Sequence, residues 1–114
     1  MDQATGQQPT SEITATELKQ RLDNGDDIQI IDVREPDEVA IGRIPNSVHI
    51  PLAQVVNRMG EIDAGRETVM HCKMGGRSAK AVGILREHGF TRVKNLKGGI
   101  LSWIEKIDPS QPTY

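Results

Sequence analysis

One short apolar run restricts the folds open to this chain more than any other feature. Residues 28–33 read IQIIDV, a nearly continuous β-branched segment that is broken after residue 33 by Arg34, Glu35 and Pro36. Such a run is typical of a strand buried on both faces of a parallel sheet. The chain is therefore expected to surround this strand with further strands and covering helices.

Helix and strand signals alternate through the rest of the chain. The polar flanks and breakers predict strands at residues 28–33, 48–50, 68–71 and 92–96. Helices are predicted at residues 15–22, 52–59 and 78–88, in one turn at 37–41, and after Gly98 and Gly99. Short apolar strands separated by helices indicate a three-layer α/β/α domain with a parallel sheet of four to five strands.

Two local signals support the helix boundaries. Thr14 with Glu17 three positions later forms a capping-box pattern ahead of residues 15–22. Pro51 occupies a first-turn position, where its missing N–H is tolerated, ahead of residues 52–59. In parallel sheets ligands bind at the carboxyl ends of the strands. Asp32 and Cys72 both fall at such ends, so one crevice could hold both.

Composition excludes several classes of function. The 114 residues suit one domain, and 14 cations against 16 anions give a net charge of −2, which argues against a nucleic-acid binder. The sequence contains no run of about 18 apolar residues, so no membrane span is predicted. A single cysteine cannot form an internal disulfide, so a reducing, cytoplasmic setting is expected. Residues 1–11 are predicted to be a disordered tail or linker, and residues 12–114 the domain, a monomer by default.

The lone cysteine lies where a thiol can become a nucleophile. Cys72 ends the strand at 68–71, and Lys73 and Arg77 flank it in sequence before the predicted helix at 78–88 begins. A helix N-terminus and nearby cations stabilise a thiolate. Gly75 and Gly76 allow the backbone to curl with its N–H groups inward, as an anion-binding nest. The alternative is that Cys72 is simply a small buried apolar residue.

The remaining chemistry-bearing residues have simpler interpretations. His71 precedes Cys72 on a strand, so its side chain is expected on the opposite face, as a structural histidine rather than a general base. One cysteine and three scattered histidines show no metal-ligand spacing, so no metal site is expected. Trp103 is predicted to be a core residue that packs the last helix onto the sheet.

Three motifs in order resemble those of the rhodanese family. The first comprises IDVREPDE at residues 31–38, followed by GRIP at 42–45 and IPL at 50–52. The second, HCKMGGRS at residues 71–78, resembles the family's active loop, and the third is LKGGILSW at residues 96–103. Two positions depart from the usual pattern, with Arg43 where histidine is common and Asn46 where glycine is common.

The resemblance implies transfer of sulfane sulfur from a donor such as thiosulfate to a thiophilic acceptor. Cys72 would carry the sulfur as a persulfide, the only covalent intermediate, with no separate cofactor. The amides of the loop residues would hold the terminal sulfur, Arg77 would anchor the loop and Lys73 would attract an anionic donor. The loop residues are Lys73, Met74, Gly75, Gly76 and Arg77. Asp32, Arg34 and Ser78 would support the loop.

Residues 98–114 also resemble the end of fused adenylyltransferase–sulfurtransferases. That resemblance implies a ubiquitin-like sulfur-carrier protein as acceptor and an adenylating domain as a fused partner. The sulfur donor would be thiosulfate or the persulfide of a cysteine desulfurase. Gly98 and Gly99 would allow the last helix to approach the active loop.

Two other classes of protein are rivals. Cysteine phosphatases and arsenate reductases with a related fold use a loop with five residues between cysteine and arginine. Here four residues separate Cys72 from Arg77, which makes a smaller cradle that suits sulfur better than phosphate. A non-catalytic binding module is the other rival, and retention of Cys72, Gly75 and Arg77 argues against it.

Overall fold

The structure is a computed structural model that describes residues 11–114. The predicted tail or linker at residues 1–11 falls almost entirely outside the described residues, so its boundary with the domain stays a prediction.

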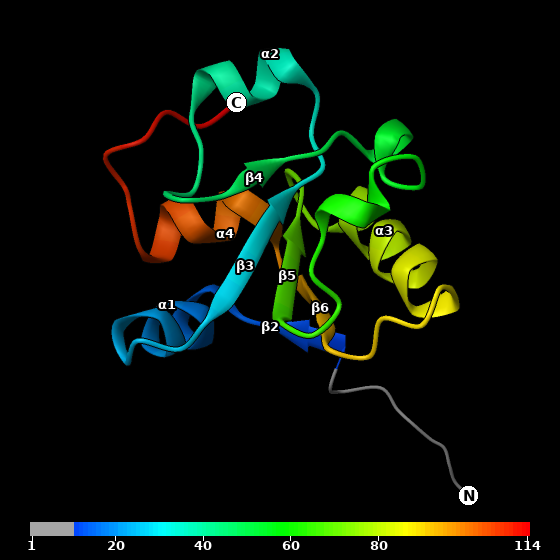
Figure 1. Cartoon of the computed structure of the whole chain (residues 1–114). Helices are drawn as coiled ribbons and strands as arrows, with labels where there is room; N and C mark the ends of the chain where they lie inside the picture. The colour runs from blue at the N-terminus through cyan, green and yellow to red at the C-terminus, as the bar shows by residue number, and fades with distance from the viewer. Residues whose placement is uncertain (1–10) are drawn as a thin grey trace, which may run out of the picture.

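Five parallel strands form one central sheet, which confirms the predicted fold class (Figure 1). Their spatial order is β2-β6-β5-β3-β4, and every neighbouring pair is parallel. The strands are β2 (Glu12–Ile13), β3 (Ile28–Asp32), β4 (Val48–His49), β5 (Glu67–His71) and β6 (Val93–Leu96). β3 and β5 occupy the interior of the sheet and are buried along their whole length, as the apolar run predicts.

Within residues 11–114, four α-helices complete the domain. They are α1 (Ala15–Asp23), α2 (Pro36–Ile41), α3 (Gly76–Glu87) and α4 (Gly99–Lys106). Figure 1 shows α1 and α4 together on one side of the sheet and α3 on the other, with α2 above the strand ends. The capping box before α1 is present, since Thr14 Oγ1 accepts from the Glu17 N–H at 3.1 Å.

Alternation along the strands divides the core into two halves. On β3, Ile28 and Ile30 join the cluster beneath α1 and α4, whereas Ile31 joins the cluster beneath α3. On β5, Val69 and Met70 divide in the same way. This period of two sends Cys72 to the α3 side with Met70.

Two expected helix boundaries were wrong. Residues 52–59 form no α-helix. The structure has two short 3-10 segments instead, η2 (Leu52–Gln54) and η3 (Met59–Glu61), joined by turns. The backbone closes i to i+3 hydrogen bonds here, such as Val55 N–H to the Leu52 carbonyl, in place of a continuous α-helical ladder. α3 begins at Gly76, two residues earlier than expected, because Gly75 caps it in the left-handed conformation with φ 114°.

Candidate active site

Cys72 lies in the short loop between β5 and α3, at the carboxyl end of an interior strand. Its side chain points toward α3 and the residue is 2% exposed. In contrast, Met74, two positions further along the loop, has 67% of its surface exposed. The sulfur is therefore recessed beneath a loop whose outer surface is open to an approaching molecule.

Hydrogen-bond donors converge on the sulfur. The Gly75 N–H donates to Cys72 Sγ at 3.1 Å, and the Ser78 hydroxyl lies 3.4 Å from it. Burial alone would raise the pKa of the Cys72 thiol. The Ser78 hydroxyl and the backbone N–H groups of Ser78, Gly75 and Met74 outweigh burial and bring that pKa below its ordinary value. This is the cradle of amide donors that the two glycines predict.

The Ser78 hydroxyl links the sulfur to β6. It lies 2.6 Å from Asn95 Oδ1, and Asn95 Nδ2 donates to the Gly75 carbonyl at 3.0 Å. A hydroxyl has one proton, so it can donate either to Asn95 or to the sulfur. A thiolate is the stronger attraction for that proton. Asn95, which sequence reasoning missed, fixes the loop from β6 through its bond to the Gly75 carbonyl, whichever acceptor takes the Ser78 proton.

The start of α4 holds the loop from its other side. The N–H groups of Ile100 and Leu101 donate to the carbonyls of Cys72 and Lys73 at 2.9 and 3.2 Å. A Cβ at Gly99 would lie 2.3 Å from the Lys73 oxygen, so only glycine permits this approach. The expectation that the glycine pair lets α4 reach the active loop is confirmed.

Arg77 anchors the loop to α2. Its guanidinium donates twice to the Glu38 carboxylate, at 2.6 and 2.9 Å. These bonds, with further donors, lower the pKa of Glu38 from 4.5 to about 2. Glu38 in turn raises the pKa of Arg77. The positive charge of Arg77 is thus largely balanced by a carboxylate that no local sequence pattern identified.

Asp32 and Arg34 form a fully buried ion pair, with Arg34 Nη2 2.8 Å from Asp32 Oδ2. Burial favours a raised pKa for Asp32, but the Arg34 guanidinium and the nearby His71 keep it below its ordinary value. Asp32 and its register partner His71 follow the α1 and α4 side of the sheet, whereas Cys72 faces α3. Asp32 and Cys72 therefore lie at neighbouring strand ends with their side chains on opposite faces of the sheet.

His71 is fully buried, as expected for a structural residue. Its Nε2 lies 3.7 Å from Asp32 Oδ2, and burial lowers the pKa of the ring despite the nearby carboxylate. A second histidine has a role that the sequence did not reveal. His49 Nε2 lies 2.6 Å from the Arg34 carbonyl and ties β4 to the segment after β3.

Asn46 explains one departure from the family pattern. It is the one non-glycine residue within residues 11–114 with a positive φ, at 66°. Asparagine tolerates this left-handed conformation better than most side chains, so it can replace the usual glycine.

Tyr114 closes the site from the far end of the chain. Its hydroxyl donates to Glu38 Oε2 at 2.8 Å and accepts from Arg34 Nη1 at 3.1 Å. Its ring lies beneath the Lys73 ammonium, with Nζ 4.6 Å from the ring centroid. A chain of polar contacts therefore runs from the buried ion pair to the active loop.

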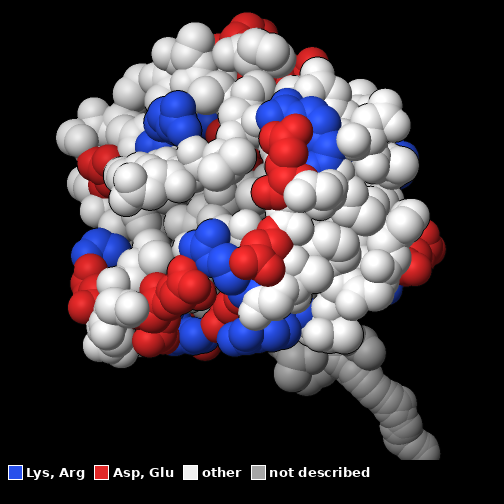
Figure 2. Space-filling view, viewed as in Figure 1, with Lys and Arg blue, Asp and Glu red and all other residues white. Residues whose placement is uncertain are grey.

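The surface and the described groups place limits on other chemistry. Lys and Arg lie among Asp and Glu over the face shown in Figure 2, without a single-sign stripe. Across residues 11–114 no group of three potential ligands could hold a metal ion. No helix in that range has the length and apolar content needed to cross a membrane.

The fold and the site together define an α/β domain with a cysteine nucleophile held in an amide cradle. The sequence matches the family of rhodanese-like domains over residues 14–106. It is 40% identical over 93 residues to a sulfurtransferase of Allochromatium vinosum, covering 82% of this chain and 87% of that protein. A rhodanese-related protein from Thermoplasma volcanium superposes with a TM-score of 0.77 at 32% identity, covering 84% of this chain and 92% of that one. The chain belongs to the rhodanese-like family.

A second group of relatives is much longer. The adenylyltransferase and sulfurtransferase MOCS3-1 of Zea mays is 33% identical over 112 residues, which is 92% of this chain. The match covers only 24% of that protein, so the chain spans about a quarter of its length. The expected similarity to adenylyltransferase–sulfurtransferases is therefore present, and it concerns one part of such proteins.

Proposed function

We propose that this chain is a sulfurtransferase that carries sulfane sulfur as a persulfide on Cys72. The thiolate attacks the outer sulfur of thiosulfate. A sulfur–sulfur bond to Cys72 forms while the bond to the sulfonate breaks, and sulfite leaves with the electron pair. A thiophilic acceptor such as cyanide then attacks the terminal sulfur and returns Cys72 to the thiolate. The cycle needs no metal and no cofactor beyond the persulfide itself.

The observation that carries this proposal is the convergence of donors on Cys72 Sγ within a loop of limited size. The Gly75 N–H and the Ser78 hydroxyl reach the sulfur, and the pKa of the thiol is lowered. The same amides can hold the negative terminal sulfur of a persulfide. Four residues between Cys72 and Arg77 leave a cradle better matched to one sulfur atom than to a tetrahedral phosphate.

The proposal extends to the physiological donor and acceptor of the sulfur. We expect the sulfur donor to be thiosulfate or the persulfide of a cysteine desulfurase. The similarity to adenylyltransferase–sulfurtransferases supports a ubiquitin-like sulfur-carrier protein as acceptor, activated by a fused or separate adenylating domain. Met74, exposed beside Cys72, offers such a protein an apolar contact. The proposal includes a monomeric domain in a reducing, cytoplasmic compartment, without nucleic-acid or membrane partners.

Mass spectrometry after incubation with thiosulfate tests the persulfide directly. We expect a mass gain of one sulfur atom, reversed by cyanide with release of thiocyanate. Cys72→Ser should show neither event, while Glu61→Gln, a change away from the active loop, should behave like the parent. Sulfur transfer that survives Cys72→Ser would contradict the assigned nucleophile.

An aryl phosphate assay separates the rival classes. A phosphatase would hydrolyse the aryl phosphate and form no thiocyanate. A pure binding module would do neither and would gain no sulfur. We expect thiocyanate formation and no phosphate release.

A further inference from the structure

Three cations in and near the active loop have different kinds of partner. Arg34 is paired with Asp32 and Arg77 with Glu38, each at 2.6–2.8 Å, so carboxylates balance their charges. Lys73 has no ion pair with a carboxylate among residues 11–114, and its ammonium rests on the Tyr114 ring instead. An aromatic face attracts a cation without neutralising its charge. No carboxylate among the described residues therefore offsets the ammonium of Lys73, which follows the nucleophile directly in sequence.

Tyr114 is itself held in a fixed orientation. Its hydroxyl uses both hydrogen-bonding roles, donating to Glu38 and accepting from Arg34. Arg34 also lies over the ring, with Cζ 5.8 Å from the centroid. The ring is thus fixed by α2 and by the buried ion pair.

Residues 108–114, here named the strap, bring Tyr114 to this place. Figure 1 shows the strap passing from α4 to the side of α2. Gln111 joins it to the loop after α2, accepting from the Arg43 N–H and donating to the Arg43 carbonyl, both at 2.9 Å. The strap therefore has two attachments, one at Gln111 and one at Tyr114.

The backbone of Lys73 is equally constrained. The Leu101 N–H donates to the Lys73 carbonyl at 3.2 Å, which fixes where the side chain begins. Tyr114 fixes where it ends. A lysine side chain that is held at its backbone and at its ammonium loses less conformational entropy when it binds an anion.

We infer that Tyr114 is a positioning residue, which holds the ammonium of the loop residue Lys73 in a fixed place to receive an anionic sulfur donor. This inference rests on the proposed sulfur transfer at Cys72. The donor class it selects is a small anion such as thiosulfate. Tyr114 acts through Lys73 and touches no reacting atom.

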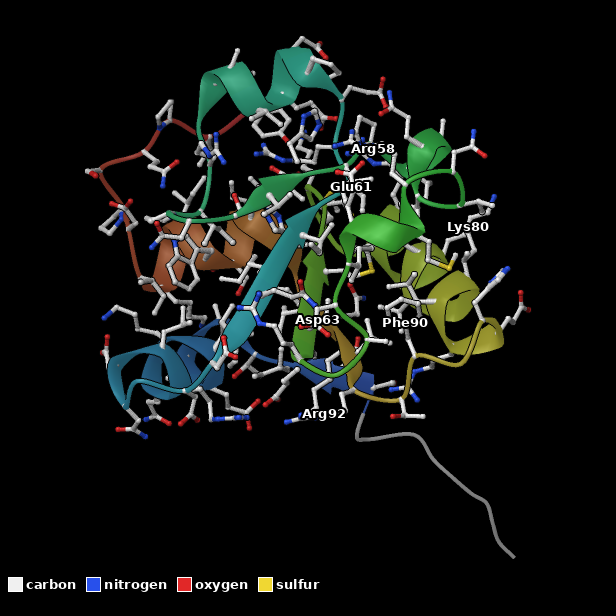
Figure 3. The ribbon with its side chains drawn as sticks, viewed as in Figure 1. Arg58, Glu61, Asp63, Lys80, Phe90 and Arg92 are labelled. Carbon is white, nitrogen blue, oxygen red and sulfur yellow. The ribbon has the colours of Figure 1, made fainter. Side chains whose placement is uncertain are left out.

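Steady-state sulfur transfer from thiosulfate to cyanide tests the inference. Lys73→Ala should raise KM for thiosulfate about tenfold and change kcat less than twofold, since it removes one charge opposite a dianion. Lys80→Ala removes the same charge from α3, where Figure 3 shows the side chain on the outer side of the helix, and should leave KM unchanged. The KM of the parent should rise with salt, and that of Lys73→Ala should rise less.

Two replacements of Tyr114 isolate the aromatic face. Tyr114→Phe and Tyr114→Leu both lose the hydroxyl and keep an apolar side chain, but only Phe offers a face to Lys73. We expect the KM for thiosulfate of Tyr114→Leu to be about two- to fivefold higher than that of Tyr114→Phe, with a similar kcat in both variants. In the Lys73→Ala background the two replacements should give equal KM values, because the ammonium that contacts the side chain at position 114 has been removed.

The outcomes separate the inference from the function on which it rests. If the parent protein gains no sulfur from thiosulfate by mass spectrometry, the proposed function fails. If it does gain sulfur, but Phe and Leu at position 114 give equal KM values, only the role of Tyr114 fails. A fall in kcat with unchanged KM, or additive effects with Lys73→Ala, would also overturn it and indicate a purely structural role.

Discussion

Replacing Glu38 by glutamine removes the charge that anchors the active loop to α2. The carboxylate accepts two bonds from Arg77, one from Tyr114 and one from the Glu35 N–H. Glutamine has nearly the same shape but only one acceptor oxygen and no charge. The change therefore tests the anchor with little change in packing.

The expected loss of stability follows from the pKa of Glu38. A fall from 4.5 to about 2 corresponds to roughly 3 kcal/mol if it is taken in full. The Arg77 side chain is 37% exposed, so solvent screens part of the interaction. We therefore expect Glu38→Gln to lower the free energy of unfolding by about 1–2 kcal/mol at pH 7.

The pH dependence has a definite sign. A folded-state pKa below the unfolded value stabilises the fold above pH 4.5 and stops doing so as pH falls through about 2. The difference between the parent and Glu38→Gln should therefore shrink on acidification, with roughly half or more lost by pH 3.

Urea unfolding at pH 7, 5, 4 and 3 measures this difference. Glu61→Gln is the matched control, because Glu61 also accepts twice from one arginine, Arg58, at 2.9 Å, but lies away from the loop. Figure 3 shows this pair together at the surface. It should give no resolvable change. The reasoning is refuted if Glu38→Gln matches Glu61→Gln at pH 7, or if its effect is the same at pH 7 and pH 3.

Two further perturbations test the contacts around the sulfur. Gly99→Ala should destabilise the protein by about 2 kcal/mol or more in thermal unfolding, because its Cβ would lie 2.3 Å from the Lys73 oxygen at a φ of +61°. Gly83→Ala, in α3 with nothing within 4 Å, should instead stabilise it by about 0.5–1 kcal/mol, and a similar result at both positions would contradict the argument. Ser78→Ala should raise the pKa of Cys72, so that the rate of alkylation by iodoacetamide rises at higher pH than in the parent, and an unchanged pH profile would remove Ser78 from the cradle.

The sheet was predictable because its signals are local. The run at residues 28–33 needs no distant partner to identify it as a buried strand, and β5 and β6 follow the same logic. β2 was not among the predicted strands. Two residues are too few to show an alternating pattern, and this strand is recognised only by its pairing with β6. The helix prediction for residues 52–59 failed because a sequence compatible with a helix is also compatible with consecutive 3-10 turns.

The contacts of the site were less predictable because they join distant parts of the chain. Arg77 and Glu38 are 39 residues apart in sequence, and Arg34 and Tyr114 are 80 apart. No periodicity or spacing relates such positions. The motif supplied Cys72, Gly75 and Arg77, and only the fold revealed which carboxylate and which ring meet them.

Counting cations near Cys72 gives an incomplete account of its electrostatics. Lys73 and Arg77 both follow Cys72 in the active loop, yet Glu38 balances the charge of Arg77, whereas Lys73 contacts an aromatic ring. The hydrogen bonds that lower the pKa of the thiol come from Ser78, Gly75 and Met74. Stabilisation of the thiolate therefore rests mainly on the amides and the hydroxyl. This division leaves Lys73 available to meet a negatively charged donor, a task that a cation already paired with a carboxylate would perform poorly.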